Sequence, residues 1–501
     1  MKLELKIKVL DIYANYPIAI LHPNTAFHLG AQNLDRIEIK QEELHTVFVI
    51  DTSHTYVDEN TIGIFKDSAK DFNLKDGNVV SINLLNPPPA IKFIMDKVKN
   101  KTLSEDQIIE IVNEIDKNSL SEIELSAFVT GVFINELNLE ETKHLCNALV
   151  NIGDRLDFKE KIILDKHSIG GINGRVSMIL TPIIASLGYK IPKTASRSIT
   201  SSAGTADSME VLAPVTFDIN EIKKIINETN GVIAWEGKFD LCPVDNKLID
   251  IEHALGINPE GIMIASILSK KKSIGSTHLV IDIPVGRDVK IKNKDDGERL
   301  AKKFITISSF LGINTKVILT DGDKPCGKYF GPSLEAKNVL EVLENKYQDN
   351  VLEKSCLLAG ELLELVGKAK EGEGYKLAKE EVLSGRALLK FQEIIKAQGG
   401  TIFKSEDVPK AKFIEKINSP ISGKIDNFDL SKITLIAKLL GCPKDITSGI
   451  VLLCDVGDEV KENEPILEFH AKTEEKMNRA KNYFKENNPI IYQNMILEEF
   501  D

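Results

Sequence analysis

Residues 165–174 read DKHSIGGING and stand between a short apolar run at 161–164 and an apolar segment at 176–187. The apolar run predicts a strand, the glycines a turn and the longer segment a helix, which together form a unit of an α/β layer. Glycines let backbone N–H groups approach an anion, while Lys166 and Ser168 add a charge and a hydroxyl donor near a helix N-terminus. The stretch therefore predicts a phosphate site, with a purely structural glycine-rich turn as the alternative.

A second polar loop follows another predicted strand, where residues 192–207 read PKTASRSITSSAGTAD. Seven hydroxyl side chains and one arginine between 194 and 205 are more than a helix cap requires, although Thr205 is suited to cap the next helix. Functional groups of open α/β sheets lie at the carboxyl ends of the strands. Two such loops on neighbouring strands would enclose a phosphate, whereas a solvated Ser/Thr loop is the alternative.

A third signal lies in residues 262–272, IMIASILSKKK. On a helix Ser266 and Lys270 are four residues apart and share a face, while apolar side chains anchor the other side. This spacing places a hydroxyl beside an ammonium group. The alternative is the solvated basic end of a helix.

The hydrophobic pattern divides the chain into four regions and predicts a multidomain α/β protein. Short alternating runs up to the prolines at 87–89 predict a small N-terminal β-rich domain over 1–88. A helical stripe formed by Ile108, Ile109, Ile111, Val112 and Ile115 is typical of the next region. We expect a helical lobe over 89–160 joined by about 245–275, a large α/β phosphate- and substrate-binding lobe over 161–400, and a C-terminal β-sandwich-like (α+β) domain with lipoyl-type turns over 401–501.

Composition narrows the classes of function. The 501 residues carry 63 basic and 75 acidic side chains, a net charge of −12 that argues against a nucleic-acid surface. No run of about 18 apolar residues predicts a membrane span, and the alternating N-terminus is unlike a signal peptide, so we expect a cytoplasmic protein. The six cysteines are scattered, and we expect neither a metal site nor a cofactor.

Taken together, in this order and at these separations, the KHSxGG loop, the arginine-centred hydroxyl loop and the ASILSKK helix resemble the thymidine and AMP phosphorylase family. The likeness runs from about residue 91 to the C-terminus and includes PSLEA at 332–336 and residues 391–400. The region before residue 88 is similar to the extension of the AMP phosphorylase branch. The resemblance implies a helical lobe and an α/β lobe that close on the substrates, in a homodimer or larger homo-oligomer.

The resemblance also implies individual roles. Inorganic phosphate, the co-substrate, would be held by Lys166, Ser168, Ser177 and Thr205. Positions that bind AMP in the AMP branch correspond to Gly171, Ser196, Arg197, Ser198, Ile199, Thr200, Ser201, Thr205, Ser266 and Lys290. His167 would lie near the sugar and base, and Ser266 and Lys270 match base-contacting positions of the thymidine branch.

The chain departs from the AMP branch at its proposed proton donor, because Asn258 stands where that branch has an aspartate. An amide cannot give up a proton at neutral pH. Asn258 is nevertheless the position of interest for catalysis, and His253, Asp245 or a water remain as proton sources. Ala195 replaces a serine of the phosphate loop, and Glu236 stands where the AMP branch has glycine.

These observations predict phosphorolysis of a nucleoside 5′-monophosphate such as AMP, giving a free base and ribose 1,5-bisphosphate. A thymidine or pyrimidine nucleoside phosphorylase is the first alternative. A phosphoribosyltransferase such as the anthranilate enzyme is the second, but it needs Mg²⁺ and acidic ligands, and Asp207 and Glu210 are expected to stand alone beside the hydroxyl loop. A catalytically inactive nucleotide-binding protein is the third.

Overall fold

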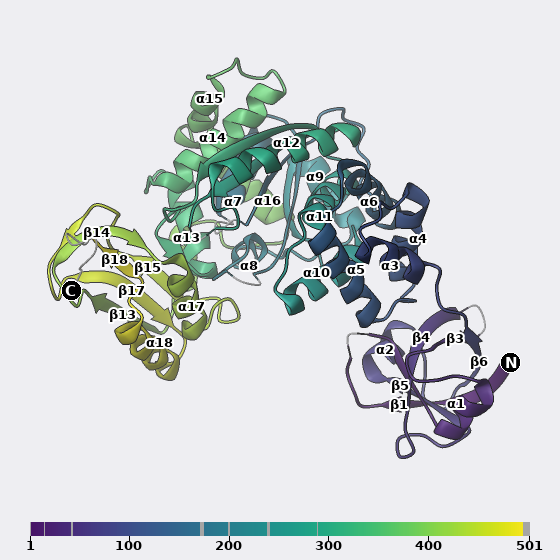
Figure 1. Cartoon of the computed structure of the whole chain (residues 1–501). Helices are drawn as coiled ribbons and strands as arrows, with labels where there is room; N and C mark the ends of the chain where they lie inside the picture. Colours follow the sequence, from purple (N-terminus) through teal and green to yellow (C-terminus); the bar gives the residue numbers. More distant parts are fainter. Residues whose placement is uncertain are drawn as a thin grey trace, which may run out of the picture. The chain divides into compact units, whose positions relative to one another are not determined.

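A computed structural model describes residues 2–14, 16–41, 44–170, 175–198, 201–237, 241–287 and 289–493. The chain forms two compact units (Figure 1), of which unit 1 comprises Met1–Gly153 and Cys242–Lys270, and unit 2 comprises Asp154–Leu241 and Lys271–Asp501. The units are interleaved in sequence, because the chain enters unit 1 twice. Among the described helices, none has the length and apolar character needed to cross a membrane.

Unit 1 begins with a closed barrel in the order β1–β5–β2–β4–β3–β6. Its elements are β1 (Lys2–Leu10), β2 (Ile18–Leu21), α1 (Pro23–Leu29), β3 (Arg36–Gln41), β4 (Leu44–Thr52), β5 (Thr61–Phe65), α2 (Lys66–Asp71) and β6 (Val79–Leu85). Along β1, Leu5 and Ile7 are buried whereas Lys6 and Lys8 are exposed. This alternation turns one face of each strand toward the barrel interior, which the apolar side chains fill.

The remainder of unit 1 is helical, with α3 (Ala90–Val98), α4 (Glu105–Asp116), α5 (Glu122–Asn135), α6 (Leu139–Ile152), α10 (Pro243–Leu255) and α11 (Glu260–Ser273), whose last residues belong to unit 2. Ser104 begins α4 with a capping box. The predicted stripe of α4 is buried except for Ile109, which is half-buried. Helix α10 packs against α4, α5 and α6, so the second segment of unit 1 joins the helices of the first.

The α/β part of unit 2 contains a parallel sheet in the order β11–β10–β7 and a parallel pair β8–β9. The strands are β7 (Leu164–Ser168), β8 (Ile191–Ala195), β9 (Gly231–Trp235), β10 (His278–Val285) and β11 (Asn314–Asp321). A bridge between Ile163 and Lys190 connects the β7 and β8 segments. Strand β7 begins where the predicted strand at 161–164 ends, so Lys166 and Ser168 are strand residues and the turn starts later than expected.

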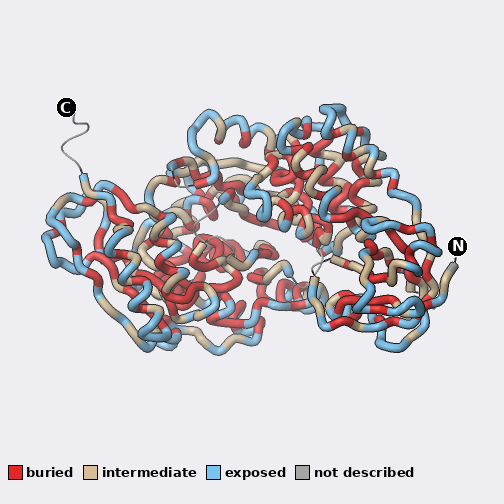
Figure 2. Tube along the Cα trace, turned by 60° about the horizontal axis from the view of Figure 1, so that its bottom comes forward, coloured by how far each residue is buried: buried red, intermediate tan, exposed pale blue. Residues whose placement is uncertain are grey.

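The helices of this part are α7 (Arg175–Ser186), α8 (Thr205–Glu210), α9 (Ile219–Thr229), α12 (Lys294–Phe310), α13 (Pro332–Leu343), α14 (Asn350–Leu365), α15 (Gly374–Leu383) and α16 (Arg386–Ala397). Helix α7 contacts α14 and α16 and is buried on all sides, with every residue from Arg175 to Ala185 buried. Figure 2 shows the buried segments at the centre of each folded region and the exposed ones around them.

The C-terminal part of unit 2 has two small sheets, β12–β15–β17–β13 and β16–β14–β18. Its elements are β12 (Tyr329–Phe330), β13 (Phe413–Asn418), β14 (Gly423–Phe428), α17 (Leu430–Leu440), β15 (Gly449–Leu452), β16 (Glu459–Val460), β17 (Pro465–Ala471), α18 (Glu474–Glu486) and β18 (Ile490–Tyr492). Helices α17 and α18 pack on each other and on β17. Since β12 pairs with β15, a strand from before residue 400 completes this α+β region.

Candidate active site

Polar side chains from three strands gather at the carboxyl edge of the parallel sheet in unit 2. In the register of β7 and β10, Ser168 stands beside Asp282. The N–H of Ile169 donates to the carbonyl of Asp282 at 2.8 Å, which keeps the two strands together at this edge. Thr320, near the end of β11, reaches the same carboxylate. This is the edge at which parallel α/β sheets bind ligands.

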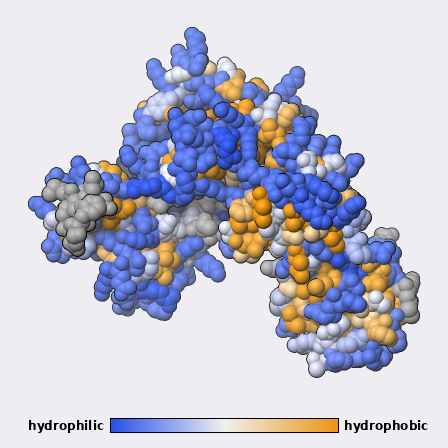
Figure 3. Space-filling view, in the orientation of Figure 1, coloured by the Kyte–Doolittle hydropathy of each residue, from blue (hydrophilic) through white to orange (hydrophobic). Residues whose placement is uncertain are grey.

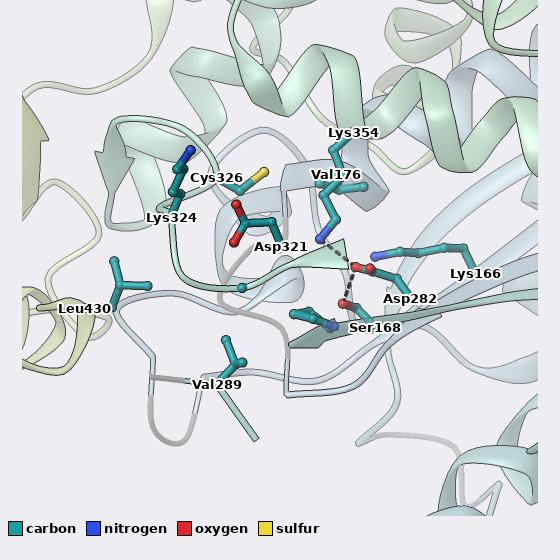
Figure 4. A pocket seen from close by; sticks show the side chains of 12 residues that line it. Lys166, Ser168, Val176, Asp282, Val289, Asp321, Lys324, Cys326, Lys354 and Leu430 are labelled. Carbon is teal, nitrogen blue, oxygen red and sulfur yellow. Dashed lines mark hydrogen bonds and ion pairs between the residues drawn. The ribbon is translucent and has the colours of Figure 1, made fainter. Parts of the chain in front are cut away.

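Asp282 is the centre of the polar network (Figure 4). Its Oδ2 accepts hydrogen bonds from Ser168 Oγ at 2.7 Å and lies 2.8 Å from Lys354 Nζ, and its Oδ1 accepts from Thr320 Oγ1 at 2.6 Å. Burial by itself would raise the pKa of Asp282, but the charges of Lys166 and Lys354 outweigh it and hold the pKa below its ordinary value. Asp282 is therefore a buried carboxylate that is ionised at neutral pH.

Lys166 is a buried cation beside this network. Its side chain is 2% exposed and points toward Asp282 (Figure 4). Burial lowers the pKa of Lys166 to about 8, although the charge of Asp282 opposes this change. Within the part of the chain that the structure describes, its ammonium group has no hydrogen bond or ion pair. A buried charge is stabilised only by a partner, so an anion in front of Lys166 would complete the site.

These groups line one pocket in unit 2. Its lining consists of Lys166, Ser168, Val176, Asp282, Pro284, Val289, Asp321, Gly322, Lys324, Cys326, Lys354 and Leu430. Three lysines face two aspartates there, which leaves an excess of positive charge suited to a small anion. Sequence reasoning missed Asp282, Lys324 and Lys354. The only signal for Lys354 was one basic residue near the start of the largely apolar α14, which is too common a pattern to identify a site.

The other predicted phosphate ligands begin the helices that follow the two loops. Ser177 is buried in the first turn of α7, and Thr205 is the first residue of α8. His167 is half-buried on β7. No described residue from 196–205 lines the pocket that contains Lys166. The structure therefore brings Lys166 and Ser168 together and does not place the hydroxyl loop in the same pocket.

Lys290 lies against the glycine-rich turn. Gly170 has a φ of +61°, and a Cβ added to it would come within 2.8 Å of Lys290 Cβ. Only glycine meets both conditions without strain, so the stem of Lys290 closely covers the turn. The predicted ligands Gly171, Ile199 and Thr200 lie outside the described residues.

The hydroxyl loop is organised by Arg197. Its guanidinium donates to Asp207 at 3.3 Å and to Glu210 Oε1 at 2.8 Å, and it lies 4.7 Å from the centre of the Trp235 ring. Asp207 and Glu210 therefore share Arg197 as a partner, because the loop folds back and places Arg197 against α8. A Cβ on Gly204 would lie 2.6 Å from the carbonyl oxygen of Ser196, so this close return requires glycine.

The serines of this loop have different surroundings. Ser196 is exposed, while Ser198 and Ser201 are half-buried. The N–H of Ser198 donates to Asp207 at 2.7 Å, and the Ser198 hydroxyl donates to the carbonyl oxygen of Ser201. Asp207 also accepts the N–H of Gly204 at 2.8 Å. One carboxylate thus holds both ends of the loop, which orders its donors in advance.

A buried charge cluster lies on the other side of β7. Asp165 is fully buried, with Lys271 Nζ at 2.7 Å and Lys193 Nζ at 3.8 Å. Burial, together with the charge of Lys271, lowers the pKa of Lys193 to about 7. The cluster ties β7, β8 and the end of α11 together beneath the strand that carries Lys166. Sequence reasoning did not identify it.

The second group of predicted residues lies in unit 1, where α10 and α11 meet. Asp245 Oδ2 accepts the Ser266 hydroxyl at 2.8 Å and lies 2.9 Å from Lys270 Nζ. Asp245 is fully buried. Ser266 and Lys270 do lie side by side as predicted, with Asp245 as their common partner. Asn258, between the two helices, donates through Nδ2 to Met263 Sδ at 3.6 Å, and His253 is exposed.

We expect Lys270→Ala to lower kcat and to destabilise the protein by about 3 kcal/mol, because it leaves the carboxylate of Asp245 buried without its cation. The double variant Lys270→Ala/Asp245→Asn should recover most of that stability without recovering kcat. Ser266→Ala should lower kcat with little loss of stability. Denaturant unfolding and steady-state kinetics measure both quantities, and full activity in both single variants would show that this helix is structural only.

The parallel α/β sheet with a basic pocket at its carboxyl edge, together with the helical region, corresponds to the two domains of the glycosyl transferase family. Residues 91–153 match the helical bundle domain of the glycosyl transferase family, and residues 160–388 match its a/b domain. Residues 424–491 match the pyrimidine nucleoside phosphorylase C-terminal domain. These matches confirm the predicted multidomain α/β organisation in its broad form.

Individual relatives narrow the class further. The chain is 38% identical to an AMP phosphorylase of Methanococcus vannielii, over 93% of this chain and 92% of that protein. It is 38% identical to an AMP phosphorylase of Thermococcus sibiricus, over 99% of both. The chain belongs to the AMP phosphorylase family, which confirms the resemblance drawn from the three motifs. An anthranilate phosphoribosyltransferase from Thermus thermophilus shares the fold, with a TM-score of 0.52, 16% identity and coverage of 62% of this chain and 99% of that one.

Proposed function

We propose that the protein cleaves the N-glycosidic bond of a nucleoside 5′-monophosphate such as AMP with inorganic phosphate. The products are a free base and ribose 1,5-bisphosphate. The relatives named AMP phosphorylase match nearly the whole chain. The observation that carries the proposal is the Lys166 pocket, in which a buried ammonium group lies beside Ser168 and Lys354.

The reaction requires an oxygen of phosphate to form a bond to the anomeric carbon while the bond from that carbon to the base breaks. The departing base takes the bonding electrons and then a proton. The enzyme has to hold the phosphate within about 3.5 Å of the anomeric carbon and to stabilise the negative charge on the base. Lys166 and Ser168, with Ser177 and Thr205, are proposed to hold the phosphate, and no metal or cofactor is part of this scheme.

The family resemblance assigns the nucleotide to two groups of residues, the hydroxyl loop of unit 2 and the Ser266–Lys270 pair of unit 1, and we propose the same roles here. The 5′-phosphate of the nucleotide is assigned to the loop that Arg197 organises, including Ser196, Ser198, Ser201 and the sequence-predicted Ile199 and Thr200. Gly171, in the glycine-rich stretch after β7, is the further position that the family resemblance assigns to the nucleotide. His167 and Lys290 are assigned to the sugar side. Ser266 and Lys270 are assigned to the base, where the ammonium group of Lys270 would stabilise the leaving group. The Ser266 hydroxyl, which donates to Asp245, would lie beside it. Asp245 accepts the Ser266 hydroxyl and forms an ion pair with Lys270, so as a carboxylate it has no proton to give. The exposed His253 or a water is therefore the proposed proton source.

The test is release of free adenine from AMP by the full-length chain. Release should require phosphate and continue in EDTA, because the proposed phosphate ligands are Lys, Ser and Thr side chains and not carboxylates that hold a metal. Release in phosphate-free buffer would indicate a hydrolase, and loss of activity in EDTA would favour the phosphoribosyltransferase class. The match to a pyrimidine nucleoside phosphorylase domain keeps thymidine and uridine in the substrate panel. If no substrate of the panel released its base, the remaining hypothesis would be a catalytically inactive nucleotide-binding protein.

Asn258→Asp should raise activity on AMP, because it restores a group able to donate a proton at the position where the AMP branch has one. The rise should appear in kcat and should weaken at high pH as the carboxyl group ionises. Asn258→Ala serves as the control for changes in the loop itself. Unchanged kcat in Asn258→Asp would show that the proton comes from elsewhere, such as His253 or solvent, or that adenine is not the leaving group.

We also infer that the protein works in the cytoplasm as a homodimer or larger homo-oligomer, as the family resemblance implies. Helix α5 exposes Ile123, Phe133 and Ile134, and apolar surface is visible over the helical region of unit 1 in Figure 3. Apolar patches of this kind are typical of contacts between subunits. A second copy of this chain is the proposed partner, and sedimentation of the full-length protein tests it against a monomer.

A further inference from the structure

The hydrogen bond between Ser168 and Asp282 has a defined direction. Asp282 is ionised, since the charges of Lys166 and Lys354 hold its pKa low despite burial. An ionised carboxylate accepts hydrogen bonds and cannot donate them. At an Oγ to Oδ2 distance of 2.7 Å, the hydrogen of the Ser168 hydroxyl is therefore given to Asp282. Ser168 therefore presents only the lone pairs of its oxygen to the pocket.

The surroundings of Asp282 fix this direction. Lys354 Nζ lies 2.8 Å from Oδ2 and donates to Thr320 Oγ1 at 3.0 Å, and Thr320 in turn donates to Oδ1 at 2.6 Å. The carboxylate is thus held from three elements, β7, β11 and α14. Turning the Ser168 hydroxyl toward the pocket would sacrifice a charge-assisted hydrogen bond, which is about twice as strong as a neutral one.

We propose that Asp282 and Lys354 are positioning residues that make Ser168 a hydrogen-bond acceptor, so that the pocket selects a tetrahedral oxyanion carrying a proton. Hydrogenphosphate meets this requirement. Sulfate and the dianion of a phosphate monoester do not. This inference rests on the proposed function, in which the pocket holds the inorganic phosphate that attacks the sugar.

The chemistry of the three anions explains the selection. Hydrogenphosphate keeps one O–H group at neutral pH, and that group can donate to Ser168 while the other oxygens face Lys166. A phosphate monoester loses its last proton near pH 6, and sulfate has none at neutral pH. Either of these would place an oxygen lone pair against that of Ser168.

Two consequences follow for the reaction. The 5′-phosphate of the nucleotide is disfavoured in the pocket of the attacking phosphate, so each phosphate enters its own site. The protonated oxygen held by Ser168 is a poor nucleophile. An unprotonated oxygen is thereby left to form the bond to the anomeric carbon.

The test measures dissociation constants of phosphate, sulfate and methyl phosphate for the full-length protein at pH 7.5 by calorimetry. Phosphate should bind at least about tenfold more tightly than the other two, the cost of one lost hydrogen bond. In Ser168→Ala the binding of phosphate should weaken, while the binding of sulfate and methyl phosphate stays unchanged or improves. The ratio of the dissociation constant of either anion to that of phosphate should therefore approach one. Equal weakening of all three anions would show that Ser168 is an ordinary donor and would overturn the proposal.

Asp282→Asn provides an independent variant, because the amide can donate to Ser168 and turn the serine hydrogen into the pocket. In Asp282→Asn the affinity for sulfate relative to phosphate should rise at least to the value measured for Ser168→Ala. Ser186→Ala is the matched control, since Ser186 makes a similar bond of 2.8 Å to Glu381, a residue outside the pocket lining, and it should leave the ratio unaltered. If Asp282→Asn does not fold, Ser168→Ala decides alone.

The outcomes separate this proposal from the proposed function. A wild-type protein that neither binds phosphate nor uses it to release a base would contradict the proposed function itself. A protein that carries out phosphorolysis but binds sulfate as tightly as phosphate would retain that function and lose only the selectivity assigned to Ser168.

Discussion

Lys166→Ala should raise the KM for phosphate by about 10- to 150-fold, the range that corresponds to roughly 1.5–3 kcal/mol for a hydrogen bond to a charged group. Lys166 is 2% exposed, and its ammonium group has no hydrogen bond or ion pair within the described part of the chain. Removal of this ammonium group should therefore weaken the binding of phosphate. Initial rates of adenine release at varied phosphate concentration measure the effect.

Lys324→Ala is the matched control, because Lys324 lines the same pocket but is exposed. Its charge is screened by solvent, so its KM for phosphate should change by less than about threefold. A phosphate KM that stays at the wild-type value in Lys166→Ala would remove the DKHSIGG strand end from the phosphate site.

The pH dependence of phosphate use follows from the same residue. Burial lowers the pKa of Lys166 to about 8, so the ammonium form predominates below that pH and is lost as the pH rises through it. The free enzyme should therefore lose kcat/KM for phosphate above about pH 8. The two charged groups beside Lys166 act on its pKa in opposite directions, because the charge of Asp282 raises it and the charge of Lys354 lowers it. In Lys166→Arg the decline should move beyond the accessible range, since a guanidinium group stays charged.

AMP should be cleaved at least about a hundredfold better than adenosine in kcat/KM, because two charge-assisted hydrogen bonds to the 5′-phosphate suffice for that difference. The hydroxyl loop has the donors for these contacts. Arg197 is held by Glu210 and Asp207 and lies over Trp235, so its remaining N–H groups are fixed in direction before a ligand arrives. Such preorganisation reduces the entropy lost on binding.

The comparison uses AMP, CMP and UMP against adenosine, cytidine, uridine and thymidine at one phosphate concentration. Arg197→Ala should lower kcat/KM for AMP and leave that for adenosine nearly unchanged. Arg299→Ala, which removes a surface arginine paired with Asp296 on α12, is the control. Thymidine or uridine cleaved as well as any monophosphate would replace this assignment with a pyrimidine nucleoside phosphorylase.

The sequence by itself determined the family and pointed to Lys166, the residue proposed to be the principal anion ligand. Strand, glycine turn and helix follow one another in a pattern that local preferences impose, and Lys166 and Ser168 belong to that local pattern. The spacing of Ser266 and Lys270 likewise placed them on one face of a helix, because the helical period is local. Each of these inferences needed only residues close together in the chain.

Tertiary structure alone decided which partners these residues have. Asp282 meets Ser168 through the parallel register of β7 and β10, and Lys354 arrives on a helix nearly two hundred residues further along the chain. The pairing of Arg197 with Glu210 depends on how the loop folds back. A carboxylate determines whether a neighbouring hydroxyl donates or accepts and whether a buried lysine keeps its charge, and these effects act over a few ångströms in space regardless of distance in sequence.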